Sequence, residues 1–180
     1  EPGEALAATL RQRGRRATVV SADQRDVSAI REACAEAEQA LGPIDVLVNS
    51  AATWPQADLD TLTQEAFDEA LEVNLRGPFF WALTLGRAMR RRGRGAIISL
   101  ADVTAERPDP EALPYGLAKA GVVSMTYGLA KALAPEVRVN AIGPGPVLFP
   151  EGYPAERAAA DRQATLRGRE GRPEDVAAAV

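Results

Sequence analysis

Tyr115 and Lys119 stand four positions apart in the segment Tyr115-Gly-Leu-Ala-Lys119. In a helix this spacing places both side chains on one face, with the phenol and the ammonium group one turn apart. A phenol ordinarily has a pKa of about 10, which is too high for proton exchange near neutrality. Because a nearby cation stabilises the phenolate, we expect Lys119 to lower the pKa of Tyr115 into the range of a general acid or base.

The composition of the chain excludes several other chemistries. The 180 residues contain no histidine, which removes Ser-His-Asp hydrolysis and most zinc sites, and we predict no metal site. The single cysteine, Cys34, lies in an alanine-rich stretch and is expected to be a packing residue. The net charge of −4 gives no electrostatic reason to expect nucleic acid or a membrane surface as a partner. No apolar run approaches the roughly 20 residues that span a bilayer, and we expect a cytoplasmic protein that acts on a small molecule.

Short, β-branched runs alternate with longer helical stretches along the chain. The predicted strands cover 17–21, 44–48, 95–100 and 137–142. The predicted helices cover 4–13, 27–41, 63–92 and 114–134, and another begins at 173. This alternation predicts right-handed crossovers and a single α/β domain over 1–180, built on a Rossmann-type, doubly wound parallel sheet whose strands are buried on both faces.

The first elements of the chain are unusual for such a fold. A predicted helix precedes the first predicted strand, and no glycine-rich phosphate-binding turn stands anywhere in the sequence. In doubly wound dinucleotide-binding folds, the first strand lies at the centre of the sheet and carries that turn. A sheet without its middle strand would leave backbone groups unpaired. We therefore expect an incomplete dinucleotide-binding domain, without its N-terminal strand and phosphate turn, that also continues beyond Val180.

The sequence around Tyr115 and Lys119 resembles the short-chain dehydrogenase/reductase family over nearly the whole chain. Further motifs stand in the family's order: Ala22-Asp23, Leu47-Val-Asn-Ser-Ala-Ala52, Asn74 and Pro144-Gly145. The resemblance implies that Tyr115 and Lys119 are catalytic, and that Asn74 holds a proton-relay water through its backbone. It also implies a cofactor site formed by Tyr115 and Lys119 together with Asp23, Asn49, Ser50, Ala51, Pro144 and Gly145. Ser50 and Ala52 depart from the family's Asn-Asn-Ala-Gly pattern.

Asp102 is a further departure from the family's pattern. The family places a serine thirteen positions before the tyrosine, and this sequence has Asp102 there. In this respect it is similar to the pteridine reductases within the family, as are the segments 102–108 and 145–151. That resemblance implies hydride transfer from NADPH to a pterin or dihydrofolate-like substrate, whose ring Asp102 and Tyr115 would contact. NADPH rests on this resemblance alone, since the residue that distinguishes NADP from NAD follows a strand that we expect upstream of Glu1.

Aromatic residues complete the predicted substrate site. Trp54 follows the cofactor-side turn, where the resemblance implies an aromatic ring stacked on the pterin. Phe149 and Tyr153 lie in a proline-rich stretch after Gly145, which we interpret as a substrate lid, with Phe149 contacting the substrate. Trp81 is expected in the core or a subunit interface. The family resemblance also implies a homotetramer or homodimer formed through the helices 63–92 and 114–134.

Two alternatives to a pterin reductase remain open. The first is a dehydrogenase/reductase that acts on an ordinary alcohol or ketone, with Asp102 as an idiosyncrasy of this chain. The second is a non-catalytic, nucleotide-binding or oligomer-forming relative that has lost turnover. Asp102 favours pterin reduction over the first alternative. The presence of Tyr115, Lys119 and Asn74 weighs against the second.

Overall fold

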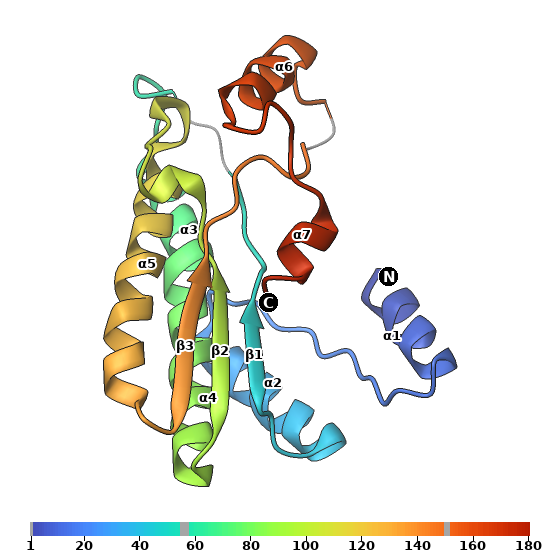
Figure 1. The fold of residues 1–180 in the computed structure, drawn as a ribbon. Helices are drawn as coiled ribbons and strands as arrows, with labels where there is room; N and C mark the ends of the chain where they lie inside the picture. Colours follow the sequence, from blue (N-terminus) through green and yellow to red (C-terminus); the bar gives the residue numbers. More distant parts are fainter. Residues whose placement is uncertain (1, 55–57, 150–151) are drawn as a thin grey trace.

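Three parallel strands form a sheet in the order β1–β2–β3 in a computed structural model that describes residues 2–54, 58–149 and 152–180 (Figure 1). The strands are β1 (Val46–Asn49), β2 (Gly95–Leu100) and β3 (Val137–Ile142). Leu47 is paired with Ile97, and Ile97 is paired with Val139. Because the strands are parallel and adjacent, their carboxyl ends, and the loops that follow them, meet at one edge of the sheet. The parallel α/β fold predicted from the sequence is confirmed.

The helices follow the predicted order with small shifts at their ends. They are α1 (Pro2–Gln12), α2 (Val27–Leu41), α3 (Gln64–Leu71), α4 (Gly77–Arg92), α5 (Leu113–Leu133), α6 (Ala155–Ala164) and α7 (Pro173–Ala177). Asp26 caps α2 by accepting a hydrogen bond from the Ser28 backbone N–H, at 2.7 Å. Thr63 caps α3, as its position before acidic residues predicts, by accepting one from the Ala66 N–H at 3.2 Å. The sequence therefore marks the starts of α2 and α3 to within about one residue.

The core lies between one face of the sheet and the helices α2, α4 and α5. Its buried residues are Ile30, Cys34, Ala82, Leu85, Met89, Ile97, Leu129, Leu133, Val137 and Val139. Cys34 is a packing residue here, as expected, and burial raises the pKa of its thiol to about 11. Trp81 packs against the same cluster from a partly buried position, which agrees with its predicted place beside the core.

The opposite face of the sheet is less covered than predicted. β2 is buried along its length, but Val46 and Val48 of β1 are 55% and 41% exposed. Arg138 and Asn140 of β3 are also exposed on this face. The expectation that all strands are buried on both faces is therefore wrong for β1 and β3, because the helices that pack in the described core lie against the other face.

Two other expectations about the elements are wrong. Residues 17–21 form no strand, because the described residues supply no neighbouring strand to share their backbone hydrogen bonds. The predicted helix 63–92 is interrupted by a π-helical turn, η1 (Glu72–Arg76), which separates α3 from α4.

The helix α6 was not predicted, although its alanine-rich composition favours a helix. Pro150 and Glu151 of the predicted lid lie outside the described residues. No helix within the described residues is long and apolar enough to cross a bilayer.

We predict that Ile97→Ala destabilises the protein by about 2–5 kcal/mol, because it opens a cavity where a fully buried strand residue meets two helices. Chemical denaturation measures the change in the free energy of unfolding. Leu59→Ala is the matched control, since Leu59 is 73% exposed, and it should cost less than about 0.5 kcal/mol. An equal loss in the free energy of unfolding in the two variants would contradict the position assigned to the core.

Candidate active site

Tyr115 lies in the first turn of α5, opposite the end of β2. Pro114 occupies an early position of this helix, where a proline fits because the N–H it lacks has no helical partner. The Tyr115 hydroxyl donates a hydrogen bond to Asp102 Oδ2 at 3.0 Å. Asp102 Oδ1 accepts one from the Thr104 backbone N–H at 2.8 Å, which caps the short helix η2 (Val103–Ala105). Both oxygens of the Asp102 carboxylate are therefore held in place.

Lys119 lies one turn further along α5 and is buried, with 4% of its surface exposed. Its Nζ stands 5.4 Å from the centroid of the Tyr115 ring, so the two side chains share a helix face as predicted. The ammonium group donates a hydrogen bond to the backbone oxygen of Leu100, the last residue of β2, at 2.8 Å. Burial lowers the pKa of Lys119, while the negative charge of Asp102 opposes this shift. The three residues thus meet where β2 ends.

The pKa of Tyr115 moves opposite to the predicted direction. Burial of the phenol raises its pKa above the ordinary value of about 10, and the charge of Asp102 and the hydrogen bond to it raise it further. The spacing of Tyr115 and Lys119 indicates only the effect of the cation on the phenol. In the structure the carboxylate contacts the phenol directly, whereas the Lys119 ammonium group is directed at a backbone carbonyl. Burial and the Asp102 carboxylate therefore both favour the neutral phenol of Tyr115.

Asn74 occupies the centre of the π-helical turn η1 and is 1% exposed. Its Nδ2 donates to the Ala70 backbone oxygen at 2.9 Å, and its Oδ1 accepts from the Thr53 N–H at 3.0 Å. The Asn74 side chain therefore connects the loop after β1 to α3, through Thr53 and Ala70. π-helical turns inside α-helices are frequent at functional sites. The backbone role expected for Asn74 stays a prediction.

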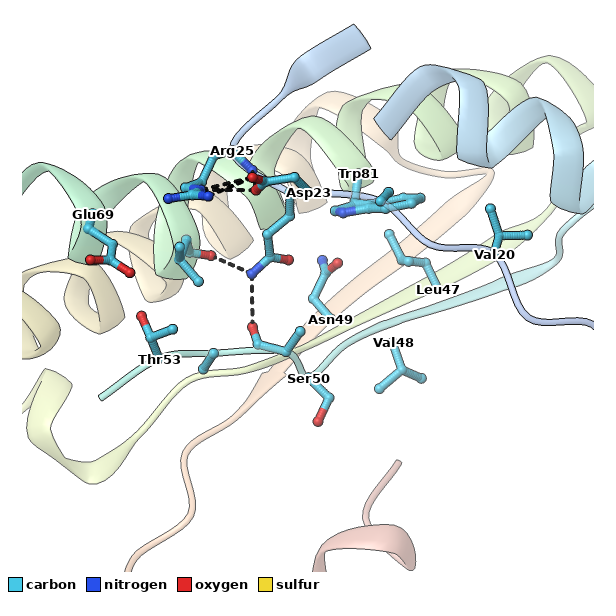
Figure 2. Close-up of a pocket in the computed structure, with 15 residues that line it drawn as sticks. Val20, Asp23, Arg25, Leu47, Val48, Asn49, Ser50, Thr53, Glu69 and Trp81 are labelled. Atoms are coloured by element: carbon cyan, nitrogen blue, oxygen red, sulfur yellow. Dashed lines mark hydrogen bonds and ion pairs between the residues drawn. The ribbon is translucent and has the colours of Figure 1, made fainter. Parts of the chain in front are cut away.

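A pocket of about 650 Å³ gathers four of the residues predicted to bind the cofactor, namely Asp23, Asn49, Ser50 and Ala51 (Figure 2). Asn49 directs its amide inward, donating to Ser99 Oγ at 3.2 Å and to the Pro78 backbone oxygen at 3.4 Å. Ser50 and Ala51 are exposed at the end of β1. Trp81 also lines this pocket.

Asp23 stands at one side of this pocket and is paired with Arg25. The Arg25 guanidinium group contacts both carboxylate oxygens at 2.7–3.0 Å, and the Arg25 backbone N–H donates to Asp23 Oδ1 at 2.9 Å (Figure 2). These bonds lower the pKa of Asp23 to about 2. Asp23 is therefore an anionic acceptor that Arg25 holds in place.

Gln24 is a pocket residue that the sequence analysis missed. Its Nε2 donates to the backbone oxygens of Val73 at 2.8 Å and of Ala51 at 3.4 Å. A β-carbon on Gly77 would stand 2.8 Å from the Gln24 backbone oxygen, so a glycine is needed at this close approach. Gln24 thereby joins the turn after residue 23, the end of β1 and the π-helical turn. Its sequence neighbours give no signal of these long-range contacts.

Pro144 and Gly145 do not line this pocket but follow β3. The Val103 backbone N–H donates to the Pro144 oxygen at 3.0 Å, which places the turn after β3 beside Asp102. The predicted cofactor residues thus form two groups, one around Asp23 and one around Tyr115. No glycine-rich turn for the connecting phosphates stands in the sequence.

Trp54, Phe149 and Tyr153 form a cluster that we call the aromatic trio. The Phe149 and Tyr153 rings are stacked at 5.0 Å between centroids, and the Trp54 ring lies 5.8 Å from that of Tyr153 at a tilt of 33°. The structure thus brings the two predicted substrate contacts, Trp54 and Phe149, together through Tyr153. From the sequence, Tyr153 is expected in the lid but not among the substrate contacts.

Comparisons with known proteins agree on the family. A family model described as enoyl-(acyl carrier protein) reductase matches residues 1–180. The chain is 40% identical over 138 residues to a probable galactose dehydrogenase of Rhizobium meliloti, covering 76% of this chain and 54% of that protein. It is 37% identical over 186 residues to the short-chain reductase protein NovJ of Streptomyces niveus, covering 98% of this chain and 71% of that protein. It is 33% identical over 136 residues to galactitol 2-dehydrogenase of Agrobacterium fabrum, covering 74% of this chain and 53% of that protein.

Solved structures extend this agreement to three dimensions. A dehydrogenase/reductase from Sinorhizobium meliloti 1021 superposes with a TM-score of 0.88 at 35% identity, over 98% of this chain and 70% of that one. A blue fluorescent protein from a metagenomic library, in complex with NADPH, superposes with a TM-score of 0.90 at 30% identity, over 98% of this chain and 72% of that one. The chain spans little more than half the length of the galactose and galactitol dehydrogenases.

We predict that the Tyr115 phenolate forms only above pH 10 in the absence of cofactor. Phenolate absorbance, followed during alkaline titration of the wild-type protein and of Tyr115→Phe, isolates this group as the difference between the two curves. The folded chain holds the Tyr115 proton more tightly than the unfolded chain does. The contribution of Tyr115 to stability is therefore complete below about pH 10, and it is lost as the pH rises through the pKa that Tyr115 has in the folded chain. A difference curve with a midpoint below 10 would contradict this electrostatic analysis.

Proposed function

Since the chain belongs to the short-chain dehydrogenase/reductase family of oxidoreductases, we propose that the protein is an NAD(P)-dependent enzyme whose proton donor is Tyr115. The observation that supports this most directly is the 3.0 Å hydrogen bond from the Tyr115 hydroxyl to Asp102, beside buried Lys119. A bound nicotinamide supplies or accepts the hydride. Tyr115 gives or takes the accompanying proton at its hydroxyl oxygen. NADPH is the proposed cofactor on the likeness to pteridine reductases alone.

Lys119 and Asp102 have separate roles in this proposal. Lys119 would hold a ribose hydroxyl of the cofactor while its positive charge favours the phenolate that remains after Tyr115 gives up its proton. Asp102, in its ionised form, has only acceptor oxygens. A bare ketone oxygen next to this carboxylate would be repelled, whereas a substrate N–H or O–H would be bound. The site therefore favours a substrate with a hydrogen-bond donor beside the reacting carbon.

A pterin or dihydrofolate-like ring is one substrate class that meets this requirement. Its ring nitrogens and amino group present donors to Asp102, and its flat face suits stacking on an aromatic side chain. The aromatic trio offers such side chains through Trp54 and Phe149. Among the residues of the proposed site, Asp102 is the one that most favours this class.

A polyhydroxylated alcohol or sugar is the second candidate substrate class. Its hydroxyl groups are also donors, so they suit the Asp102 carboxylate equally well. The similarity to relatives named as galactose dehydrogenase and galactitol 2-dehydrogenase supports this candidate. The pterin candidate has no such support from the named relatives.

We also propose that the protein associates as a homotetramer or homodimer through α4 and α5. The exposed apolar side chains of α5 support this, since Leu117 and Tyr127 are largely solvent-accessible in the single chain. Apolar surface of this kind is commonly covered by a symmetry-related copy in homo-oligomers.

We predict that the complete protein oxidises NADPH with dihydropterins or dihydrofolate, or reduces NAD(P)⁺ with galactose or a polyol. Absorbance at the nicotinamide band, measured with each substrate and each of the two cofactors, identifies the substrate class. Tyr115→Phe should lower kcat by at least about 100-fold, the usual contribution of a positioned general acid, while cofactor binding persists. Cofactor binding without turnover of any substrate would instead support the non-catalytic alternative, and full activity of Tyr115→Phe would refute the proton-donor role.

We predict that Asp102→Ser reverses the preference for donor-bearing substrates. A hydroxyl group can donate to a ketone oxygen, so kcat/KM for simple ketones should rise while kcat/KM for the natural substrate class falls by about tenfold or more. Asp45→Ser is the control, because Asp45 is exposed and lies just before the opposite end of the sheet. Unchanged or improved turnover of the natural substrate in Asp102→Ser would count against the role given to this carboxylate.

A further inference from the structure

Arg157 makes contacts that reach from α6 to the segment leading into the catalytic helix. Its Nη2 lies 2.9 Å from Asp109 Oδ2, and its Nη1 contacts Glu111 Oε2. Asp109 caps the short helix η3 (Pro110–Ala112), which runs directly into α5 at Leu113, two residues before Tyr115. One guanidinium group therefore joins α6 to the start of the helix that carries the proposed proton donor.

The same guanidinium group also contacts the aromatic trio. The Arg157 Cζ stands 5.6 Å from the centroid of the Tyr153 ring, within the range of a cation–π interaction. The Tyr153 hydroxyl donates to Asp161 Oδ2, one turn further along α6, at 2.7 Å. Tyr153 in turn stacks on Phe149 and lies against Trp54. Arg157 thus links the trio to the segment that leads into α5.

The backbone around the trio has few hydrogen bonds of its own in the part of the chain that the structure describes. The Pro146 oxygen accepts from the Gly171 N–H, and the Pro154 oxygen accepts from the Ala158 N–H. No backbone hydrogen bond is recorded among the described residues between these two prolines. The prolines restrict the local backbone angles but cannot donate hydrogen bonds. Among the described residues, side-chain contacts therefore hold Phe149 and Tyr153.

We propose that Arg157 is a positioning residue that holds the aromatic trio at a fixed distance from Tyr115, so that the trio forms one wall of the substrate site. An isolated exposed ion pair contributes little to stability, but one arginine shared by two carboxylates and an aromatic ring forms a network. Arg157 and Asp109 are each less than a third exposed, which limits screening by solvent. The inference rests on the proposed function, because the wall matters only if Tyr115 acts on a bound substrate.

The variant Arg157→Met tests this inference in the complete protein, because methionine keeps much of the side-chain length and loses the charge. We expect KM for the substrate identified in the turnover assay to rise about tenfold, equivalent to about 1.4 kcal/mol of binding. The kcat value should change by less than about threefold and KM for the nicotinamide cofactor should not change, because Arg157 does not contact the reacting groups. Arg157→Lys retains the charge and should recover part of the loss in substrate affinity.

A second measurement reports on the aromatic trio without any turnover. Trp54 and Trp81 are the two tryptophans of the chain, so a Trp81→Phe background leaves Trp54 as the single emitter. In this background, Arg157→Met should shift the Trp54 emission to the red and increase its quenching by acrylamide. Arg94→Met is the matched control, because Arg94 is paired with Asp45 at the far end of β2 and should leave both readouts unchanged.

The outcomes separate this inference from the proposed function. Unchanged Trp54 quenching in Arg157→Met refutes the positioning role, and so does an unchanged KM for the substrate. A fall in kcat, cofactor affinity and melting temperature together also refutes it, since that pattern indicates a general folding role. If the wild-type protein turns over no substrate, the proposed function fails, and the quenching of Trp54 still decides whether Arg157 holds the trio.

Discussion

The proposed active site depends on one hydrogen bond, from the Tyr115 phenol to the Asp102 carboxylate at 3.0 Å. The bond needs the end of β2 and the first turn of α5 to be fixed relative to each other. Lys119 contributes to this by donating to the Leu100 backbone oxygen. Thr104 contributes by donating from its backbone to the other carboxylate oxygen of Asp102. The proposed catalytic role of Tyr115 therefore depends on the conformation of the residues at and just after the end of β2.

The buried face of the sheet supplies the rigidity that this bond requires. Ile97 of β2, Met89 of α4 and Leu133 of α5 belong to one buried cluster, which fixes the strand relative to both helices. A glycine at position 86 allows close contact, because a β-carbon there would stand 2.8 Å from a terminal carbon of Leu133. The same helices position the π-helical turn with Asn74, which ties down the loop after β1. The core and the site are thus parts of one packing arrangement.

Much of this arrangement could be predicted from residue patterns, because helix starts, β-branched strands and the Tyr115–Lys119 spacing are local signals. The bounds of α2, β2 and β3 agree with the predicted ones. Three features depended on distant residues and were missed or wrong: the absence of a strand at 17–21, the contacts of Gln24, and the raised pKa of Tyr115. The raised pKa of Tyr115 could not be predicted without knowing that Asp102, thirteen positions away, contacts the phenol more closely than the Lys119 ammonium group does. The π-helical turn likewise has no distinct signal in the residues 72–76.

A crystal structure of the complete protein with an oxidised nicotinamide cofactor and a substrate analogue is the most direct measurement of the central claim. We predict that the Tyr115 hydroxyl and the Asp102 carboxylate remain within hydrogen-bond distance of each other or of one shared substrate atom, with Lys119 on the cofactor ribose. The analogue should present a donor to Asp102. An analogue bound away from Tyr115, or an Asp102 side chain turned out of the substrate site, would contradict the proposed chemistry.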